Sequence, residues 1–265
     1  MRKITKKFYN NKNDMFGLPQ IYKGVEFYPI KLKDFEAQSL YYKIFQYPKD
    51  FISQKEIIKA SYLKFLLIYI NSQWSKDLGE SLDVSLIRFL EIITKHDDDV
   101  YIGFSDVSLE ISIKIGATVF TEQEFEVIRE IILNQNGSSV EYVEEYHPEL
   151  EKVLQYSSRK FSNLSLEDEI WAFCSIMHKT IHEIEDYTLY QFNKHFERLI
   201  LSYNHNLYSP LEISGQIKSK NGSEIIKHFL SPIDKKGRYS SILVSTDAYL
   251  TEHPEMVDGG KLGNV

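Results

Sequence analysis

The clearest structural signal lies between residues 165 and 229, where the chain reads Ser-Leu-Glu-Asp-Glu-Ile-Trp at 165–171, Ile-His-Glu-Ile-Glu-Asp-Tyr-Thr-Leu-Tyr-Gln-Phe at 181–192 and Leu-Glu-Ile-Ser-Gly-Gln-Ile at 211–217. Apolar residues recur there at the spacing of one helix face, and polar capping residues precede the apolar runs. The pattern predicts a short capped helix, a tight link, a long aromatic-rich helix and a segment interrupted by glycine.

Capping signals place further helix starts along the chain. In a capping box, the first side chain and one three positions later each accept a hydrogen bond from the other's backbone. Such boxes begin at Ser53, Thr121 and Thr188, and Asp34 is another N-cap candidate. We expect helices over about 35–46, 54–74, 82–95, 122–136, 148–160, 166–179, 188–208 and 223–230. The 188–208 helix should present an apolar face made of Leu189, Phe192, Phe196, Leu199, Ile200 and Tyr203.

Other stretches alternate apolar and polar residues, as strands do. Residues 21–32 alternate around Gly24, which predicts a short hairpin. Residues 100–104, 109–115 and 117–120 are rich in β-branched side chains and predict a small antiparallel sheet, and 240–245 is a further candidate strand. The predicted fold class is mainly α with small antiparallel β elements (α+β): an irregular helical bundle plus a short N-terminal hairpin and a small central sheet.

Changes in pattern divide the chain into four predicted segments. Residues 1–20, rich in Lys and Asn, form a flexible N-terminal arm. Residues 21–137 form an N-terminal helical region with the hairpin and the sheet, and residues 138–231 form a C-terminal helical region. Residues 232–265, which end in a Gly-rich run, form a flexible or partner-ordered tail.

Composition excludes several classes of function. Of the 265 residues, 43% are hydrophobic and 14% are aromatic, which is enough for a sizeable core. A net charge of −7 argues against nucleic acid as a partner, because phosphate binding needs a basic surface. No signal peptide opens the chain, and no apolar run is long enough to span a bilayer, so we expect a cytosolic-type protein and no membrane partner.

Two histidines deserve consideration as metal ligands. His178 and His182 stand four residues apart, with Glu183 and Glu185 nearby. On one continuous helix both rings would share a face. However, the His-Glu-x-x-His order is absent, and we expect a helix break near residues 179–180 that separates the rings. Ordinary surface histidines are the favoured interpretation over a metal site.

The remaining reactive residue types also favour structural roles. The run from His96 to Asp99 is contiguous, whereas a calcium loop supplies oxygens at alternating positions, so a solvated loop is favoured. Cys174, the single cysteine, lies in an apolar run, which favours a small buried hydrophobe over a nucleophile. Glu167 and Glu169 stand at a helix start, where carboxylates stabilise the helix dipole. We predict no catalytic, cofactor-binding or metal-binding residue, no cofactor, and a protein that is not an enzyme.

The chain resembles the tail assembly chaperones encoded in the tail modules of large phages of low-GC Gram-positive bacteria. The matching stretches are 22–34, 125–136, 148–150, 188–192, 211–215 and 226–229. They are patterns of fold and include no catalytic signature. The 18 Tyr and 16 Phe residues suit both a core and a surface that meets other proteins.

The resemblance implies a role and a set of partners. Members of the family act in the cytoplasm of the infected bacterium and hold an aggregation-prone tail component, typically the long helical tape-measure protein. The resemblance therefore implies that this chain is a non-enzymatic phage tail or baseplate assembly protein. It would act as a chaperone or adaptor whose partner is a tape-measure or baseplate component. A homo-oligomer is a further option. The alternative, which the extension over 232–265 suggests, is a structural tail or baseplate component retained in the virion.

Overall fold

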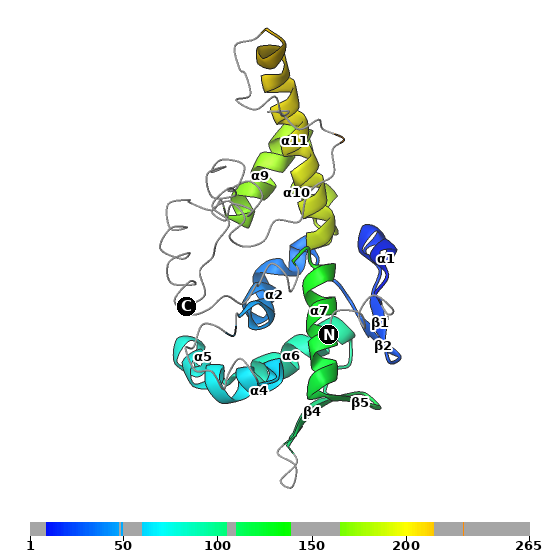
Figure 1. Cartoon of the computed structure of the whole chain (residues 1–265), viewed down its shortest axis with the longest axis vertical. Coiled ribbons are helices and arrows are strands. Elements are labelled where there is room, and N and C mark those ends of the chain that lie inside the picture. Colours follow the sequence, from blue (N-terminus) through cyan, green and yellow to red (C-terminus); the bar gives the residue numbers. More distant parts are fainter. Residues whose placement is uncertain are drawn as a thin grey trace, which may run out of the picture.

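The computed structural model describes residues 9–47, 49, 60–104, 110–138, 165–214 and 230. Helices dominate this part of the chain, and the described strands form one two-stranded and one three-stranded antiparallel sheet, which confirms the predicted fold class (Figure 1). Several predictions lie outside the described residues: the capping box at Ser53, helices over 148–160 and 223–230, the strand over 240–245 and the tail over 232–265.

The helical elements are, in chain order, α1 (Asn11–Phe16), η2 (Leu32–Asp34), α2 (Phe35–Tyr42), η3 (Lys43–Gln46), α4 (Tyr62–Lys64), η5 (Phe65–Ile70), α5 (Asn71–Leu78), α6 (Leu82–Thr94), α7 (Glu122–Gln135), α9 (Leu166–Met177), α10 (Ile181–Ile184) and α11 (Leu189–Ile213). Elements η2 and η3 are 3-10 turns, and η5 is a π-helical segment. The strands are β1 (Gln20–Tyr22), β2 (Val25–Phe27), β3 (Val100–Phe104), β4 (Ile111–Ile115) and β5 (Thr118–Thr121).

The predicted N-terminal hairpin is confirmed. Strands β1 and β2 pair antiparallel around a two-residue turn at Lys23 and Gly24. Both turn residues have positive φ, 51° and 82°, which is the geometry that matches the twist of a hairpin. The turn therefore needs a residue such as Gly24 that adopts this conformation at little cost.

Part of the segment that was predicted as a flexible arm, residues 1–20, is helical. Residues 11–16 form α1, whose N-cap side chain, Asn10, accepts a hydrogen bond from the Lys12 amide. Asp14 is buried and accepts hydrogen bonds from the Tyr9 hydroxyl (2.6 Å) and the Gln20 amide (2.9 Å). These contacts join α1 to the hairpin, which the composition of the segment did not indicate.

Two predicted helix starts are also corrected. The Asp34 side chain makes no capping bond, because the 3-10 turn η2 leads directly into α2. The predicted 54–74 helix is not continuous, because Ser61 has an extended backbone and its side chain caps α4 by accepting from the Lys64 amide. From there α4, η5 and α5 run on to Leu78, and the helix stops at Gly79 with a φ of 72°.

The predicted central sheet and the helices around it are confirmed. Strands β3, β4 and β5 form a three-stranded antiparallel sheet in that order. The Thr121 capping box is present, and α7 ends before Gly137, which has a φ of 82°. Helix α6 matches the predicted 82–95 helix within one residue.

The C-terminal helices follow the sequence pattern with one correction. Helix α9 ends at His178, so the predicted break before α10 is present. The Thr188 capping box is formed, since its hydroxyl accepts from the Gln191 amide and the Gln191 side chain accepts from the Thr188 amide. The predicted end at residue 208 is wrong, because α11 continues through Pro210 to Ile213. A proline inside a helix removes one hydrogen bond and crowds the carbonyl four residues earlier, but the helical pattern resumes here, since the Ser214 amide donates to the Pro210 carbonyl.

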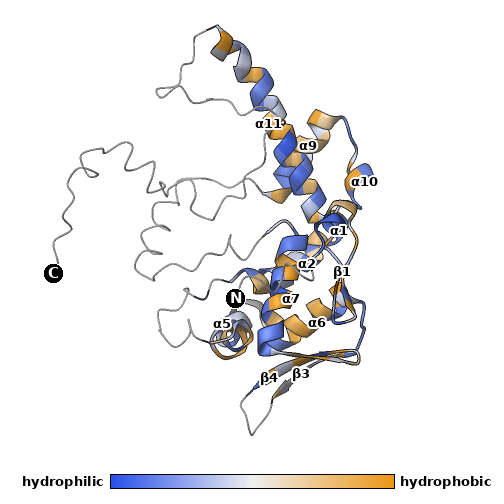
Figure 2. Cartoon of the chain, turned by 45° about the vertical axis from the view of Figure 1, so that its right-hand side comes forward, coloured by the Kyte–Doolittle hydropathy of each residue, from blue (hydrophilic) through white to orange (hydrophobic). Residues whose placement is uncertain are grey.

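Residues 30–33, which lead into the 3-10 turn η2, connect the two halves of the molecule. The Leu189 amide donates to the Ile30 carbonyl, and the Leu32 amide donates to the Tyr187 carbonyl. The Ile30 amide in turn donates to the Asn136 side chain at the end of α7. The start of α11 is therefore fixed to the core around α7, while its far end points away from it (Figures 1 and 2).

Candidate protein-interaction surface

The two histidines weighed as metal ligands are not brought together on one helix. His178 has a φ of 51° and ends α9, whereas His182 lies in α10 with its Nδ1 atom 3.2 Å from the Glu185 carboxylate. Among the residues that the structure describes, no group of three or more His, Cys, Asp or Glu side chains is arranged to hold a metal ion.

The other weighed residues are held in structural positions. The His96 Nδ1 atom lies 2.8 Å from the Thr94 carbonyl, and the Asp99 carbonyl accepts from the Gly116 amide, so this acidic turn is fixed to the sheet. Cys174 is buried, and both burial and the nearby Glu183 charge raise the pKa of its thiol, which disfavours the reactive thiolate. At the start of α9, where Glu167 and Glu169 stand, burial raises the pKa of Glu169.

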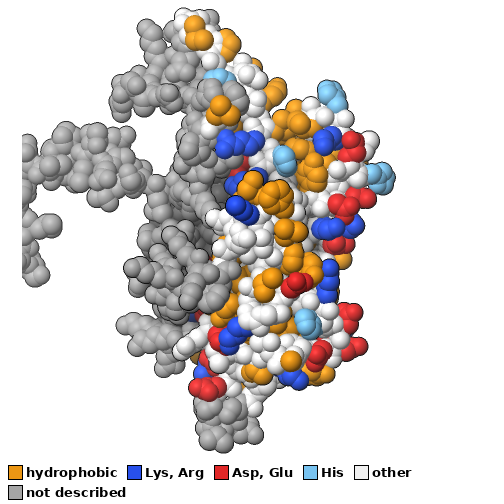
Figure 3. Space-filling view, turned by 90° about the vertical axis from the view of Figure 1, so that its right-hand side faces the viewer, with side chains coloured by type: hydrophobic (Ala, Val, Ile, Leu, Met, Phe, Trp, Pro, Cys, Tyr) orange, Lys and Arg blue, Asp and Glu red, His pale blue; other side chains and the backbone are white. Residues whose placement is uncertain are grey.

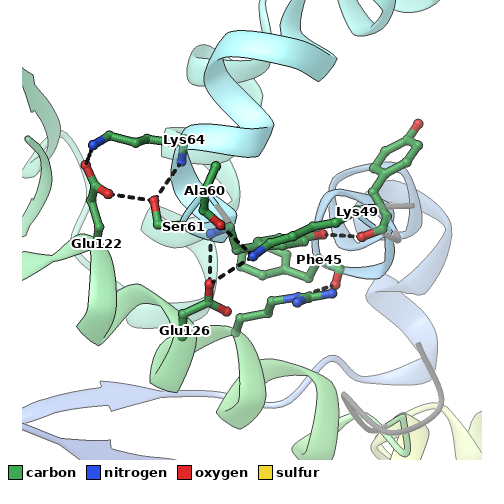
Figure 4. Close-up of polar contacts among 10 residues, drawn as sticks. Phe45, Lys49, Ala60, Ser61, Lys64, Glu122 and Glu126 are labelled. Atoms are coloured by element: carbon green, nitrogen blue, oxygen red, sulfur yellow. Dashed lines mark hydrogen bonds and ion pairs between the residues drawn. The ribbon is translucent and has the colours of Figure 1, made fainter. Parts of the chain in front are cut away.

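A cluster of charged side chains lies between α4 and α7 (Figure 4). On α7, Glu122 accepts from the Ser61 hydroxyl (2.6 Å) and lies 3.1 Å from the Lys64 ammonium. One turn later, Glu126 accepts from the Tyr62 amide (2.8 Å). Both carboxylates therefore satisfy groups at the start of α4, where a helix leaves backbone amides unpaired.

Two cations complete the cluster. Arg129 is buried, its Nε atom donates to the Phe45 carbonyl (3.1 Å), and its guanidinium lies 3.4 Å from the centre of the Tyr62 ring. Lys49 donates to the Ala60 carbonyl (2.7 Å), and its ammonium lies 3.8 Å from Glu126. Because these charges bond to backbone groups or to one another, the cluster acts as a tertiary helix cap.

The protonation states agree with that role. Burial alone would raise the pKa of Glu122, but hydrogen bonds from Ser61 and the Ile111 amide, together with Lys64, bring it below its ordinary value. Burial raises the pKa of Tyr62, whose hydroxyl donates to the carbonyls of Ile44 and Tyr47. A carboxylate held ionised and a phenol held neutral are poorly matched to proton transfer near neutral pH.

The strongest candidate for a functional surface is the second half of α11. In its first half, Leu189 and Phe192 are buried, and the Phe192 ring packs edge-on against Phe173 at 5.5 Å. Further along the same helix, Ile200 is 41% exposed and Tyr203 is 57% exposed. The predicted apolar face is thus buried over the first turns of α11 and exposed to solvent beyond them.

This bare part of the helix also lacks charge. Residues 199–211 contain no Lys, Arg, Asp or Glu. Ile200, Tyr203 and Leu207 follow one another at i, i+3 and i+7, which is the spacing of one helix face, and all three are exposed. Tyr208 and Ile213 add exposed apolar area beside them. The cores of protein interfaces are depleted in charged residues and enriched in aromatic ones, so this composition is typical of a contact surface.

A second group of exposed apolar side chains lies on the connection between α1 and β1. It consists of Met15, Phe16, Leu18 and Ile21. Figure 3 shows the face that α1 and α9 to α11 share, and hydrophobic side chains gather over its upper and middle parts. This group is divided between the end of α1, the connection after it and the start of β1, so it does not offer the continuous stripe that α11 offers.

The sequence contained a signal for the α11 surface that periodicity does not capture. The helix and its apolar face were predicted from spacing, but spacing does not separate the covered half from the bare half. The absence of charge over residues 199–211 is the distinguishing feature. Helices on a protein surface normally carry a charged face.

Comparison with known proteins gives one similarity. The model of the YomV second domain, a phage-associated family, matches residues 157–234. The matched part contains α9, α10 and α11, and the similarity is consistent with a phage protein. No curated protein and no solved structure matches the chain. Within the described residues, no helix is both long enough and apolar enough to cross a membrane.

Proposed function

We propose that the chain is a phage tail or baseplate assembly protein that acts without enzymatic chemistry, as a chaperone or adaptor for a helical tail component in the host cytoplasm. The observation that carries this proposal is the charge-free, exposed second half of α11. It falls within the part of the chain that is similar to a phage-associated family.

A helix is the partner that this surface fits best. The stripe of Ile200, Tyr203 and Leu207 repeats at three and four residues, the spacing with which one helix packs against another. From the first to the last of these residues the stripe runs about 10 Å along the axis. A partner helix with aliphatic side chains at the same spacing would cover it, as amphipathic helices do in apolar grooves.

The structural contacts of the reactive side chains support a role in binding rather than in catalysis. The carboxylates of Glu122 and Glu126 are occupied by the start of α4, and Cys174 is buried. The histidines that were weighed as ligands, His178 and His182, lie on different elements. The partner that suits such a surface is a tape-measure or baseplate component exposed before assembly is complete.

Capture of the partner tests this proposal. We expect the tagged full-length protein to recover an identified tail or baseplate protein from infected cells. The double substitution Tyr203→Glu and Leu207→Glu should reduce that recovery by about tenfold or more, because each change places a charge in the contact. The matched control is Ile92→Glu, which adds a charge at an exposed aliphatic position on α6.

The outcomes separate the proposal from its alternative. Equal recovery by wild type, double variant and control would show that α11 is not the contact. Failure of the wild type to recover any tail protein would overturn the role in assembly. Mass spectrometry of purified phage particles then distinguishes a chaperone, which is absent from them, from a structural component, which is present at fixed stoichiometry.

A further inference from the structure

The outer edge of β3 is a second candidate contact surface, remote from α11. In the sheet order β3-β4-β5, strand β3 pairs on one side only among the described strands. The sheet lies at the opposite end of the molecule from the tip of α11 (Figure 1). The other edge strand, β5, leads directly into α7 and packs against it. Strand β3 packs against α6 in the same way, and its outer edge is paired with no described strand.

Hydrogen bonding fixes which backbone groups of β3 face outward. The Gly116 amide donates to the Asp99 carbonyl (2.9 Å), so the backbone of Asp99 points toward β4. In an antiparallel pair this direction alternates at each residue, so Tyr101 and Gly103 also bond to β4. The outward N–H and C=O groups belong to Val100, Ile102 and Phe104. Among the described residues, none forms a hydrogen bond to these outward groups.

The edge lacks the sequence devices that normally keep strands apart. Proteins protect an open edge with lysine, proline, a bulge or a covering segment. Strand β3 reads Val-Tyr-Ile-Gly-Phe, with no charged residue and no proline, and its register with β4 is regular over all five pairs. Tyr101 is 53% exposed and Phe104 is 66% exposed. An apolar, unprotected edge of this kind is a template for another strand.

We propose that the edge of β3 is the seam of a homodimer, in which β3 pairs antiparallel with β3 of a second copy about a twofold axis at Ile102. In this register the outward-facing residues of β3 pair with the outward-facing residues of β3 in the second copy. Ile102 pairs with its symmetry mate, and Val100 pairs with Phe104 of the other copy. All three pairs use outward-facing backbone groups, so together they form about six interchain hydrogen bonds.

The side chains favour the same register. Tyr101 lies opposite Gly103 of the second copy, so an aromatic ring covers a residue that has no side chain, an arrangement known to stabilise sheets. The pairing of Val100 with Phe104 joins a β-branched and an aromatic residue, which is a favourable cross-strand pair. It also covers the exposed Phe104 ring. Each contact occurs twice, as an isologous interface requires.

Charge restricts where a second copy can bind. A chain with a net charge of −7 repels its own copies over much of its surface. Strand β3 itself carries no charged residue, but the acidic turn Asp97–Asp99 directly precedes it and Lys114 lies over the Tyr101 ring, so the uncharged contact is confined to the strand. The six-stranded sheet that results places its seam far from α11, so dimerisation leaves the proposed partner surface open.

The mass of the protein in solution tests the proposal. We expect the purified full chain to have about twice its 31.1 kDa mass by light scattering, and dissociation on dilution. Phe104→Lys should raise the dissociation constant by about tenfold or more, because it places a charge in the seam. Val119→Lys, at an exposed position on β5, is the matched control and should remain dimeric.

A second variant tests the register. The Ile102 amide faces away from β4, so Ile102→Pro should keep the monomer folded, with an unchanged circular dichroism spectrum, while it removes two central interchain bonds. Under oxidation, Ile102→Cys should form a disulfide-linked dimer, since paired Cα atoms at the axis lie about 5.5 Å apart. Val119→Cys should not.

Three results would overturn the proposal. The first is a wild-type protein that is monomeric at all concentrations. The second is a dimer that persists in both Phe104→Lys and Ile102→Pro. The third is cross-linking of the Ile102→Cys and Val119→Cys variants to the same extent, which would place the contact elsewhere.

Discussion

Helices α7 and α11 begin in the same way and end in different surroundings. Each is preceded by a threonine whose hydroxyl accepts a hydrogen bond from the backbone amide three residues further on. The side chain of that later residue accepts a hydrogen bond from the threonine amide in return. In α7, seven side chains are buried, including that of Arg129. In α11, which is 25 residues long, only Leu189 and Phe192 are buried among the side chains described.

The difference shows that a local helix signal does not predict what the helix packs against. Helix α7 is enclosed by the hairpin, by η3 and by α4, which lie elsewhere in the sequence. Helix α11 contacts α1, α7 and α9, and residues 30–33 bond to its first residue and to the residues just before it. Beyond that enclosure the apolar face continues without a cover in the described part of the molecule.

The largest expected effect on stability comes from comparing substitutions of buried and exposed aromatic residues. Phe125→Ala on α7 and Phe192→Ala on α11 should each lower the free energy of unfolding by about 3–5 kcal/mol, because both rings are fully buried. Tyr203→Ala should change it by less than about 0.5 kcal/mol. Urea denaturation measures all three. A large effect at Tyr203 would mean that the second half of α11 is covered within the monomer.

A second test removes the buried cation that distinguishes α7. Arg129→Ala should destabilise the fold by about 3 kcal/mol, since it leaves the Phe45 carbonyl unpaired and removes the stacking on Tyr62. The control is Arg88→Ala, because Arg88 makes an exposed ion pair with Glu80 and should cost less than about 0.5 kcal/mol. Similar denaturation midpoints for the two variants would contradict a tertiary cap at α4.

The smallest expected effect concerns the exposed ion pairs beside the start of α11. Hydrogen bonds from Lys33 and Lys31 lower the pKa of Asp186 to about 2. Because the pKa is lower in the folded state, the stabilisation is present above the ordinary value of 3.8 and is lost as the pH falls through about 2. A side-chain carboxyl titration by NMR should show this, and Lys33→Ala should move the Asp186 pKa upward. An unchanged pKa in that variant would contradict the ion pairs.

Local chemistry made part of this structure predictable. The capping boxes at Thr121 and Thr188 and the hairpin around Gly24 depend on neighbours within a few residues, so the sequence reveals them. The break at Ser61 depends on carboxylates from α7 that are remote in sequence. Tertiary contacts of that kind leave no periodic signal.

The candidate surfaces were predictable to a smaller degree. Spacing identified an apolar face on α11, but which half is covered depends on where residues 30–33 and α9 lie. The strand β3 was recognised as a strand, whereas its place at the edge of the sheet is a property of the assembled fold. The break that places His178 and His182 on separate helical elements was predicted, because it depends on residues 179–180 between them.

The hydrogen bond from Lys49 to the Ala60 carbonyl has a practical consequence for engineering. It joins two points on either side of residues 50–59, 2.7 Å apart from donor to acceptor. The Lys49 ammonium also lies 3.8 Å from the Glu126 carboxylate. Lys49→Met would therefore be a simple way to detach residue 49 from the start of α4 without altering the α11 or β3 surfaces.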